Sequence, residues 1–215
     1  MHKEMQWLID AKVHRTIENL KRNNINAMYF ENRVLAKAEI MSLITINDSI
    51  GLGGSMTVKE IGLLNELRNG GYKIFDRFAP EITREEKWEI QRQALLSDVF
   101  LTSSNAITVQ GEILNIDHSG NRVAAMLYGP NKVYIIIGIN KIVDDLDAGI
   151  KRIRKLAAPL NAKRGESEYQ PPCLTVADCI DCDSPERICN SFVLIKRQYR
   201  KDRITVVIIN EELGF

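Results

Sequence analysis

The chain has 215 residues, of which 45% are hydrophobic and 27% are charged, a composition typical of globular proteins. Lys and Arg number 29 against 28 Asp and Glu, so the formal charge of +1 gives no support to a protein that binds nucleic acid through a basic surface. A chain of this length buries roughly two-thirds of its unfolded surface, and we expect one domain over residues 1–215 that folds without a disulfide or a metal.

Apolar periodicity and cap residues predict an alternation of helices and strands. Asn32 is a predicted N-cap, Thr83 and Glu86 form a capping-box pattern, and Pro159 is expected to end the last long helix. In chain order the predicted elements are helix 2–23, strand 26–30, helix 32–43, strand 49–52, helix 57–67, strand 72–75, helix 83–96, strand 99–102, strand 112–116, helix 122–127, strand 133–137, helix 144–157, strand 192–195 and strand 204–209. The alternation predicts an α/β fold with a mostly parallel sheet flanked by helices. The inner face expected of helix 32–43 consists of Val34, Leu35, Ala38 and Ile40.

No segment is expected to export the chain or to cross a membrane. The first residues lack the apolar core of a signal peptide, and the longest apolar runs, 133–139 and 204–209, are far shorter than the ~20 residues of a spanning helix. We therefore expect a cytoplasmic protein whose cysteines are reduced or metal-bound. The pattern leaves open a monomer or a homodimer.

A glycine-rich turn lies between a predicted strand and a predicted helix. Glycines allow backbone amides to approach an anion closely, and Ser55 and Thr57 can cap the helix or donate to a phosphate or carboxylate. The candidate anion-binding residues of the turn are Gly51, Gly53, Gly54, Ser55 and Thr57. A tight turn without a ligand is the alternative. A dinucleotide site, with Asp76 as its ribose-binding acid, is weaker because Met56 stands where a third glycine is required.

A polar segment follows the strand predicted at 99–102. Ligands in open α/β sheets collect beyond the carboxyl ends of the strands, which makes Asn105 a candidate ligand contact. Asn115 alternates with apolar residues along the next strand and is a second candidate. Glu112 is a candidate catalytic carboxylate, as nucleophile or general base. Turn chemistry explains Asp117 and the residues after it without any function.

All four cysteines lie in the segment 171–190. Their spacing is C-x5-C-x2-C-x6-C, and thiolates this close in sequence can hold zinc or an iron–sulfur cluster, although the spacing matches neither the usual zinc ribbon nor the bacterial ferredoxin pattern. Reduced structural thiols and disulfides are the alternatives. The candidate ligands are Cys173, Cys179, Cys182 and Cys189.

Several of these motifs together resemble the LUD-domain family, named for lactate utilisation. The resemblance rests on residues 51–57, on residues 102–141 (TSSNAITVQGEILNIDHSGNRVAAMLYGPNKVYIIIGINK), on residues 157–162, on the cysteine segment and on residues 212–214. It implies the fold of ribose-5-phosphate isomerase, glucosamine-6-phosphate deaminase and CoA transferases. It also implies that residues 51–57 correspond to the glycine-rich turn near which those enzymes bind phosphate or CoA esters, and that residues 105–115 correspond to their central polar loop.

The same resemblance suggests three functions. The first is a component of L-lactate oxidation or a related redox system, because some LUD-domain proteins act there beside iron–sulfur partner subunits. The second is an enzyme or binding module for an anionic small molecule, a phosphorylated or CoA-linked metabolite. The third is a non-catalytic interaction protein. Neither the glutamate motif of CoA transferases nor an isomerase acid–base set is found, which leaves enzyme activity open.

Overall fold

The computed structural model describes residues 2–215. The helices are α1 (Lys3–Arg22), α2 (Arg33–Ser42), α3 (Met56–Glu60), α4 (Leu63–Asn69), α5 (Arg84–Ala94), α6 (Asn121–Leu127), α7 (Leu146–Arg152), α8 (Ala158–Arg164) and α9 (Cys173–Val176), with a 3-10 turn η1 (Ile139–Lys141) and a π-helical turn η2 (Ile153–Ala157). The strands are β1 (Asn26–Phe30), β2 (Ser49–Leu52), β3 (Lys73–Phe75), β4 (Val99–Thr102), β5 (Ala106–Thr108), β6 (Ile113–Asp117), β7 (Lys132–Gly138), β8 (Ile142–Val143), β9 (Ser191–Ile195) and β10 (Ile204–Ile209).

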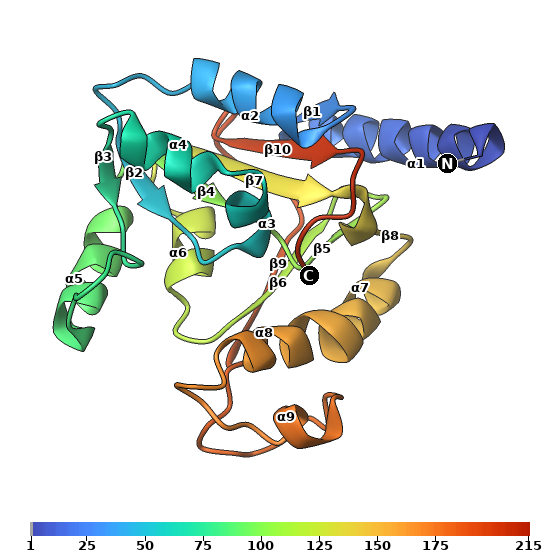
Figure 1. The fold of residues 1–215 in the computed structure, drawn as a ribbon. Coiled ribbons are helices and arrows are strands. Elements are labelled where there is room, and N and C mark those ends of the chain that lie inside the picture. The colour runs from blue at the N-terminus through green and yellow to red at the C-terminus, as the bar shows by residue number, and fades with distance from the viewer. Residues whose placement is uncertain (1) are drawn as a thin grey trace.

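Two sheets organise the fold (Figure 1). The larger has the order β1-β10-β7-β4-β2-β3, and every pair in it is parallel, which confirms the predicted α/β class. The smaller has the order β8-β5-β6-β9 and contains the antiparallel pairs β5–β6 and β6–β9. This second sheet was not predicted, because the three residues of β5 are too few to show a periodicity.

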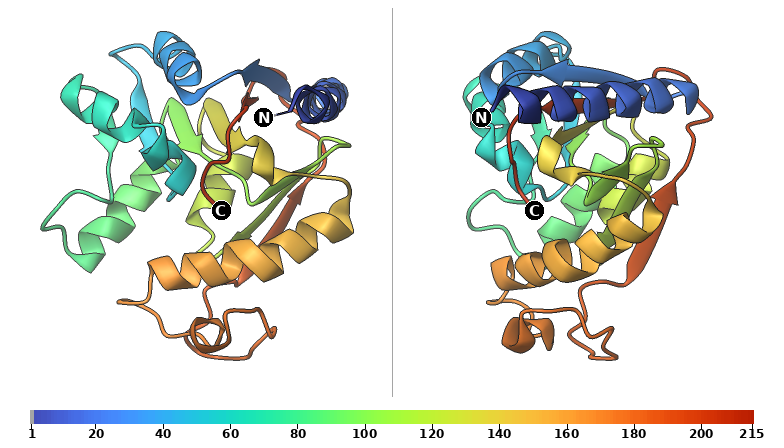
Figure 2. Two further views of the ribbon diagram at one scale, coloured as in Figure 1. Left: turned by 45° about the vertical axis from the view of Figure 1, so that its right-hand side comes forward. Right: turned by 90° about the vertical axis from the view of Figure 1, so that its right-hand side faces the viewer.

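The four inner strands of the large sheet, β10, β7, β4 and β2, are buried on both faces, as their nearly continuous apolar sequences require. Alternate residues enter different cores: Tyr134 and Ile136 pack with α2, α3 and α4, whereas Ile135 and Ile137 pack with α1, α6 and the small sheet. A third core lies between the small sheet and α7, with Leu114 and Ile153 among its members. The helix formed by α7 and α8 therefore covers the outer face of the small sheet (Figure 2).

Two helices begin at the predicted cap residues. Asn32 accepts hydrogen bonds from the amides of Val34 and Leu35 at the start of α2, and the capping box of Thr83 and Glu86 is formed at the start of α5. The face predicted for α2 was wrong in part. Ile40 is buried as predicted, and Ala36 is buried with it, while Val34, Leu35 and Ala38 are exposed.

Two helix predictions need correction. The helix predicted at 57–67 is broken between α3 and α4, where Gly62 adopts a left-handed conformation with φ of 74°. The helix predicted to end before Pro159 instead continues through it. The π turn η2 widens the helix just ahead of Pro159, and the proline falls in the first turn of α8, where a missing amide proton is tolerated. In residues 2–215 no helix has the length and apolar character needed to cross a bilayer.

Candidate anion site and cysteine cavity

Three polar loops meet at one edge of the large sheet. The loops follow β2, β4 and β7, and these strands are neighbours, because β4 pairs with both β2 and β7. Their carboxyl ends lead into Gly53–Gly54, into Ser103 and Asn105, and into η1 with Lys141. The strand order thus gathers residues that are almost ninety positions apart, at the edge where open α/β sheets bind ligands.

Lys141 lies at the centre of this edge and is only 2% exposed. Its Nζ donates to Thr57 Oγ1 and to Ser103 Oγ, both at 3.0 Å. Thr57 Oγ1 in turn donates to the carbonyl of Leu213, so the segment after β10 closes one side of the site. Burial, together with the nearby charges of Arg152 and Arg122, lowers the pKa of Lys141 to about 7. Its amine therefore changes charge near neutral pH.

Arg122, on α6, joins the segments that contain Asn105 and Asn115. Its guanidinium donates to Asn115 Oδ1 at 2.6 Å and to Asn105 Oδ1 at 3.3 Å. It also donates to the carbonyl of Ser103 at 2.9 Å and forms an ion pair with Asp117 at 3.1 Å. The side chain is 10% exposed, so it holds these segments together from the interior of the protein.

The glycine turn leaves space for two arginines. A Cβ at Gly53 would lie 3.1 Å from Arg122 Cγ and 2.5 Å from Thr102 Oγ1. A Cβ at Gly54 would lie 2.5 Å from Arg77 Nη2. The approach to Thr102 is closer than a side chain allows, which explains Gly53, whereas a side chain at Gly54 would require only the flexible end of Arg77 to shift. Because Arg122 also contacts Asn105 and Asn115, the glycine turn and the asparagine-bearing segments lie close together.

Positive charge exceeds negative charge in this cluster, which we call the basic cluster: Lys141, Arg77, Arg122, Arg152 and Arg164. Three carboxylates oppose these five cations: Asp117 pairs with Arg122, Glu60 favours the charged form of Lys141, and Glu168 favours that of Arg77. Burial lowers the pKa of Arg77, and the charge of Arg122 adds to this effect. An excess of like charge in a desolvated region is unfavourable unless an anion compensates it.

Unsatisfied polar atoms concentrate in the same place. Within residues 2–215, five buried side-chain nitrogen or oxygen atoms lack a hydrogen-bond partner, and four of them belong to Arg77, Asn115, Asp117 and Arg152. The atoms of Arg77 and Arg152 are donors, Nε and Nη2 respectively. Native proteins pair nearly all such atoms, so the free donor of Arg77 beside the glycine turn and the free donor of Arg152 near Lys141 each indicate a place for an acceptor.

Other predicted residues lie outside the basic cluster. Gly51 lies within β2, where a Cβ would meet Phe100 and Ser97, so its role is packing. Ser55 caps α3 by accepting from the amide of Val58. Glu112 lies at the β5–β6 turn, where its carboxylate accepts from Thr108 Oγ1 and faces Lys196 at 3.9 Å. Its catalytic role stays a prediction that no contact with the basic cluster supports.

Asp76, the acid proposed for a dinucleotide site, already has hydrogen-bond and ion-pair partners within the protein. Asp76 forms an ion pair with Arg68 at 2.6 Å and accepts from the amide of Phe78 at 2.9 Å. These contacts explain its position after β3 without a ribose.

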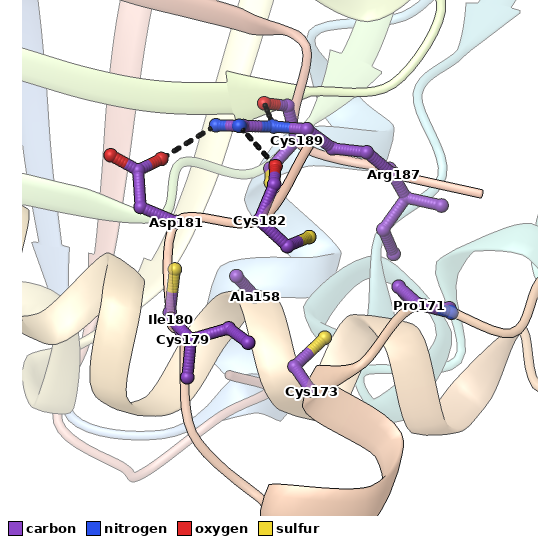
Figure 3. A pocket seen from close by; sticks show the side chains of 10 residues that line it. Ala158, Pro171, Cys173, Cys179, Ile180, Asp181, Cys182, Arg187 and Cys189 are labelled. Carbon is purple, nitrogen blue, oxygen red and sulfur yellow. Dashed lines mark hydrogen bonds and ion pairs between the residues drawn. The ribbon is translucent and has the colours of Figure 1, made fainter. Parts of the chain in front are cut away.

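The four cysteines converge at a separate place, below α8. Cys173, Cys179, Cys182 and Cys189 all line one cavity of about 20 Å³, and Figure 3 shows their side chains around Ala158. All four thiols are free and partly buried. In the described part of the chain no three His, Cys, Asp or Glu side chains are already arranged to hold a metal ion. Metal binding by these cysteines therefore stays a prediction.

Comparison with known proteins supports a family assignment. The family model described as the LUD domain matches residues 13–209. No functionally curated protein matches the chain. Among solved structures, a DUF162 family protein from Deinococcus radiodurans is similar, with a TM-score of 0.53 and 14% sequence identity over 94% of this chain and 98% of that one. At this identity the similarity concerns the fold, whereas the family model covers most of the sequence. The chain belongs to the LUD-domain family.

Proposed function

We propose that this LUD-domain protein binds an anionic small molecule that carries a phosphate group, a phosphorylated or CoA-linked metabolite, at the basic cluster. The observation that carries the proposal is the pair of buried guanidinium donors on Arg77 and Arg152 that lack a partner, in a cluster where positive charge is in excess. A phosphate oxygen accepts strongly from guanidinium groups and compensates their charge. The glycine turn lets the anion approach the backbone closely.

The division of roles within the site follows from the contacts. Arg122 is already committed to protein acceptors and positions Asn105 and Asn115. Arg77 and Arg152 retain free donors and are the expected anion contacts. Lys141, between Thr57 and Ser103, supplies a charge that appears when an anion raises its pKa. Phosphate binding is thereby coupled to proton uptake.

Ligand-dependent thermal unfolding tests this proposal with inorganic phosphate, a sugar phosphate and CoA as probes. A probe at one hundred times its Kd stabilises the folded state by about 2.7 kcal/mol, which corresponds to a rise in Tm of roughly 5–11 °C for a chain of this size. The response to each probe distinguishes a free phosphate site from one that requires a sugar or the CoA group. The absence of any shift at millimolar concentration would contradict phosphate binding.

Gly54→Asp is the variant that locates the site. Its carboxylate would enter the space beside Arg77 and compete with the anion, so we expect the phosphate-dependent shift to disappear. Gly53→Asp would also block the turn, but its Cβ would overlap the Thr102 side chain and endanger folding. Asn47→Asp is the matched control, since it makes the same change of charge on the exposed loop before β2, at the opposite end of that strand. An unaltered shift in Gly54→Asp would place the anion elsewhere.

A part in L-lactate oxidation or a related redox system is our second proposal, favoured by the four thiols that line one cavity. Such a system passes the two electrons removed from L-lactate, as it becomes pyruvate, to an iron–sulfur partner protein. The protein purified anaerobically with its partner should reduce an acceptor dye when L-lactate is added. If neither the complex nor the reduction is found, and one partner without a cofactor binds instead, the interaction-protein alternative is favoured.

A further inference from the structure

We propose that Cys173, Cys179, Cys182 and Cys189 form a tetrathiolate site for a thiophilic metal centre. This proposal is independent of anion binding at the basic cluster and would stand if that function failed. Its basis is the convergence of the four side chains on one cavity between α8 and the loop that precedes β9.

The convergence includes every cysteine of the protein. The chain contains 4 Cys among 215 residues, and all of them line the same cavity, together with the apolar side chains of Ala158, Pro171 and Ile188. Cysteines that served only to pack the loop would have no reason to gather around one cavity. None is paired in a disulfide, so all four sulfurs remain able to act as thiolate ligands.

Arg187 holds the loop around the cavity from one side. Its guanidinium donates to the carbonyl of Cys182 at 2.7 Å and to the carbonyl of Cys189 at 3.0 Å, and it pairs with Asp181 at 2.9 Å (Figure 3). Two ligand-bearing turns are therefore fixed by one side chain. The guanidinium also places a positive charge beside a site that, with four thiolates around a divalent ion, would carry two negative charges.

The backbone on either side of Cys179 is strained. Ala177 and Asp181 adopt left-handed conformations, with φ of 54° and 51°, and they bracket Cys179. Such conformations cost energy in residues other than glycine and persist where the surroundings require them. The two turns bring Cys179 back toward α8, to the same cavity that Cys173 lines.

The size of the cavity distinguishes the metal centres that could fill it. A volume of about 20 Å³ accommodates one particle the size of a water molecule, and hence one zinc ion with the thiolates drawn inward to their usual distance of roughly 2.3 Å. An iron–sulfur cluster needs more room. That room is available in an adjoining cavity of about 330 Å³, which Cys179 and Cys189 also line. Cys173 and Cys182 do not line that larger cavity and would have to move toward it, so the geometry favours a single zinc ion.

The test is the metal content of the full chain purified anaerobically. We expect one zinc ion per chain in a colourless sample, or iron with acid-labile sulfide in a brown one; either result supports the tetrathiolate site and identifies its occupant. Reaction with a thiol reagent in the native state should be slow until a chelator removes the metal. A sample without stoichiometric metal, even after reconstitution with zinc and with iron and sulfide, would overturn the proposal. Four thiols that react immediately, or two disulfides, would overturn it as well.

Variants assign the metal to these residues. Cys182→Ser and Cys189→Ser should lose the metal, and chelator should no longer change their Tm. Thr175→Ala is the control, since Thr175 is an exposed residue of the same segment that does not line the cavity. If the serine variants do not fold, the chelator-dependent thiol reactivity of the unmodified protein still decides the question. Retention of stoichiometric metal by both serine variants would contradict the proposed ligands.

Discussion

We expect Lys141→Met to abolish phosphate-dependent stabilisation and, at the same time, to increase the stability of the ligand-free protein at neutral pH. The lysine is buried among Arg152 and Arg122, and a methionine of similar length removes its desolvated charge. The hydroxyls that it contacts would keep partners, because Ser103 Oγ lies 3.4 Å from Thr57 Oγ1, which also donates to the carbonyl of Leu213. Urea denaturation with and without phosphate measures both effects.

The gain in stability depends on pH in a defined direction. The folded-state pKa of Lys141 is about 7, whereas an unfolded lysine has a pKa of about 10.4. Between these values the unfolded chain binds a proton that the folded chain lacks, so the unfolding free energy of the unmodified protein rises with pH across this window. The advantage of Lys141→Met should be several kcal/mol at pH 6, on the order of the pKa difference at ~1.4 kcal/mol per unit, and should vanish near pH 10.

Anion binding should follow the same titration. Sulfate keeps its charge between pH 6 and 9, which makes it a suitable probe. At pH 8 the binding of sulfate must be accompanied by the uptake of a proton from the solvent by Lys141, so its affinity should fall as the pH rises above about 7. Lys59→Met is the matched control, because Lys59 is an exposed residue of α3, and it should leave affinity and stability unchanged. A Lys141→Met protein that is less stable at every pH, and still responds to phosphate, would make Lys141 a structural donor only.

The fold could be predicted from the sequence where one local signal decided the outcome. The strands β1, β2 and β4 have the predicted bounds, because short apolar runs between turn residues leave no alternative. The continuation of α7 into α8 could not be predicted. It depends on a π turn that accommodates Pro159; Ile153 of this turn packs against the small sheet, a contact that the local sequence does not indicate.

The residues of the candidate site likewise divide into those that the local sequence indicates and those that depend on tertiary contacts. Gly53, Gly54 and Asn105 could be predicted because they directly follow strands of a parallel sheet. The same rule applied to β7 would have indicated Lys141, which follows the apolar run of that strand, but an isolated lysine after a strand usually lies in solvent. Nothing local distinguishes Arg77, Arg122 and Arg152 from surface arginines. Their positions depend on contacts between distant segments, as when Arg152 donates to the carbonyl of Asn105 at 2.6 Å.

We expect Arg122→Met to destabilise the protein more than any other single change in the basic cluster, by about 3–5 kcal/mol. Removal of the guanidinium leaves Asp117 as a desolvated carboxylate without its ion pair. It also leaves the carbonyls of Ser103 and Ile116 without the hydrogen bonds that Arg122 donates. The expected fall in Tm is roughly 6–20 °C for a chain of this size. Arg92→Met is the control, since Arg92 is 78% exposed and its ion pair with Glu89 contributes little.

Arg122→Lys separates the charge of this residue from its geometry. An ammonium group keeps the positive charge, but it cannot reach Asn105, Asn115 and Asp117 at once as the planar guanidinium does. If Arg122 acts by holding these segments together, Arg122→Lys should be destabilised almost as much as Arg122→Met and should bind phosphate weakly. If it acts only through its charge, Arg122→Lys should bind phosphate normally. In that case the basic cluster would attract the anion without being shaped for it, and the preorganised site that we infer from these contacts would be wrong.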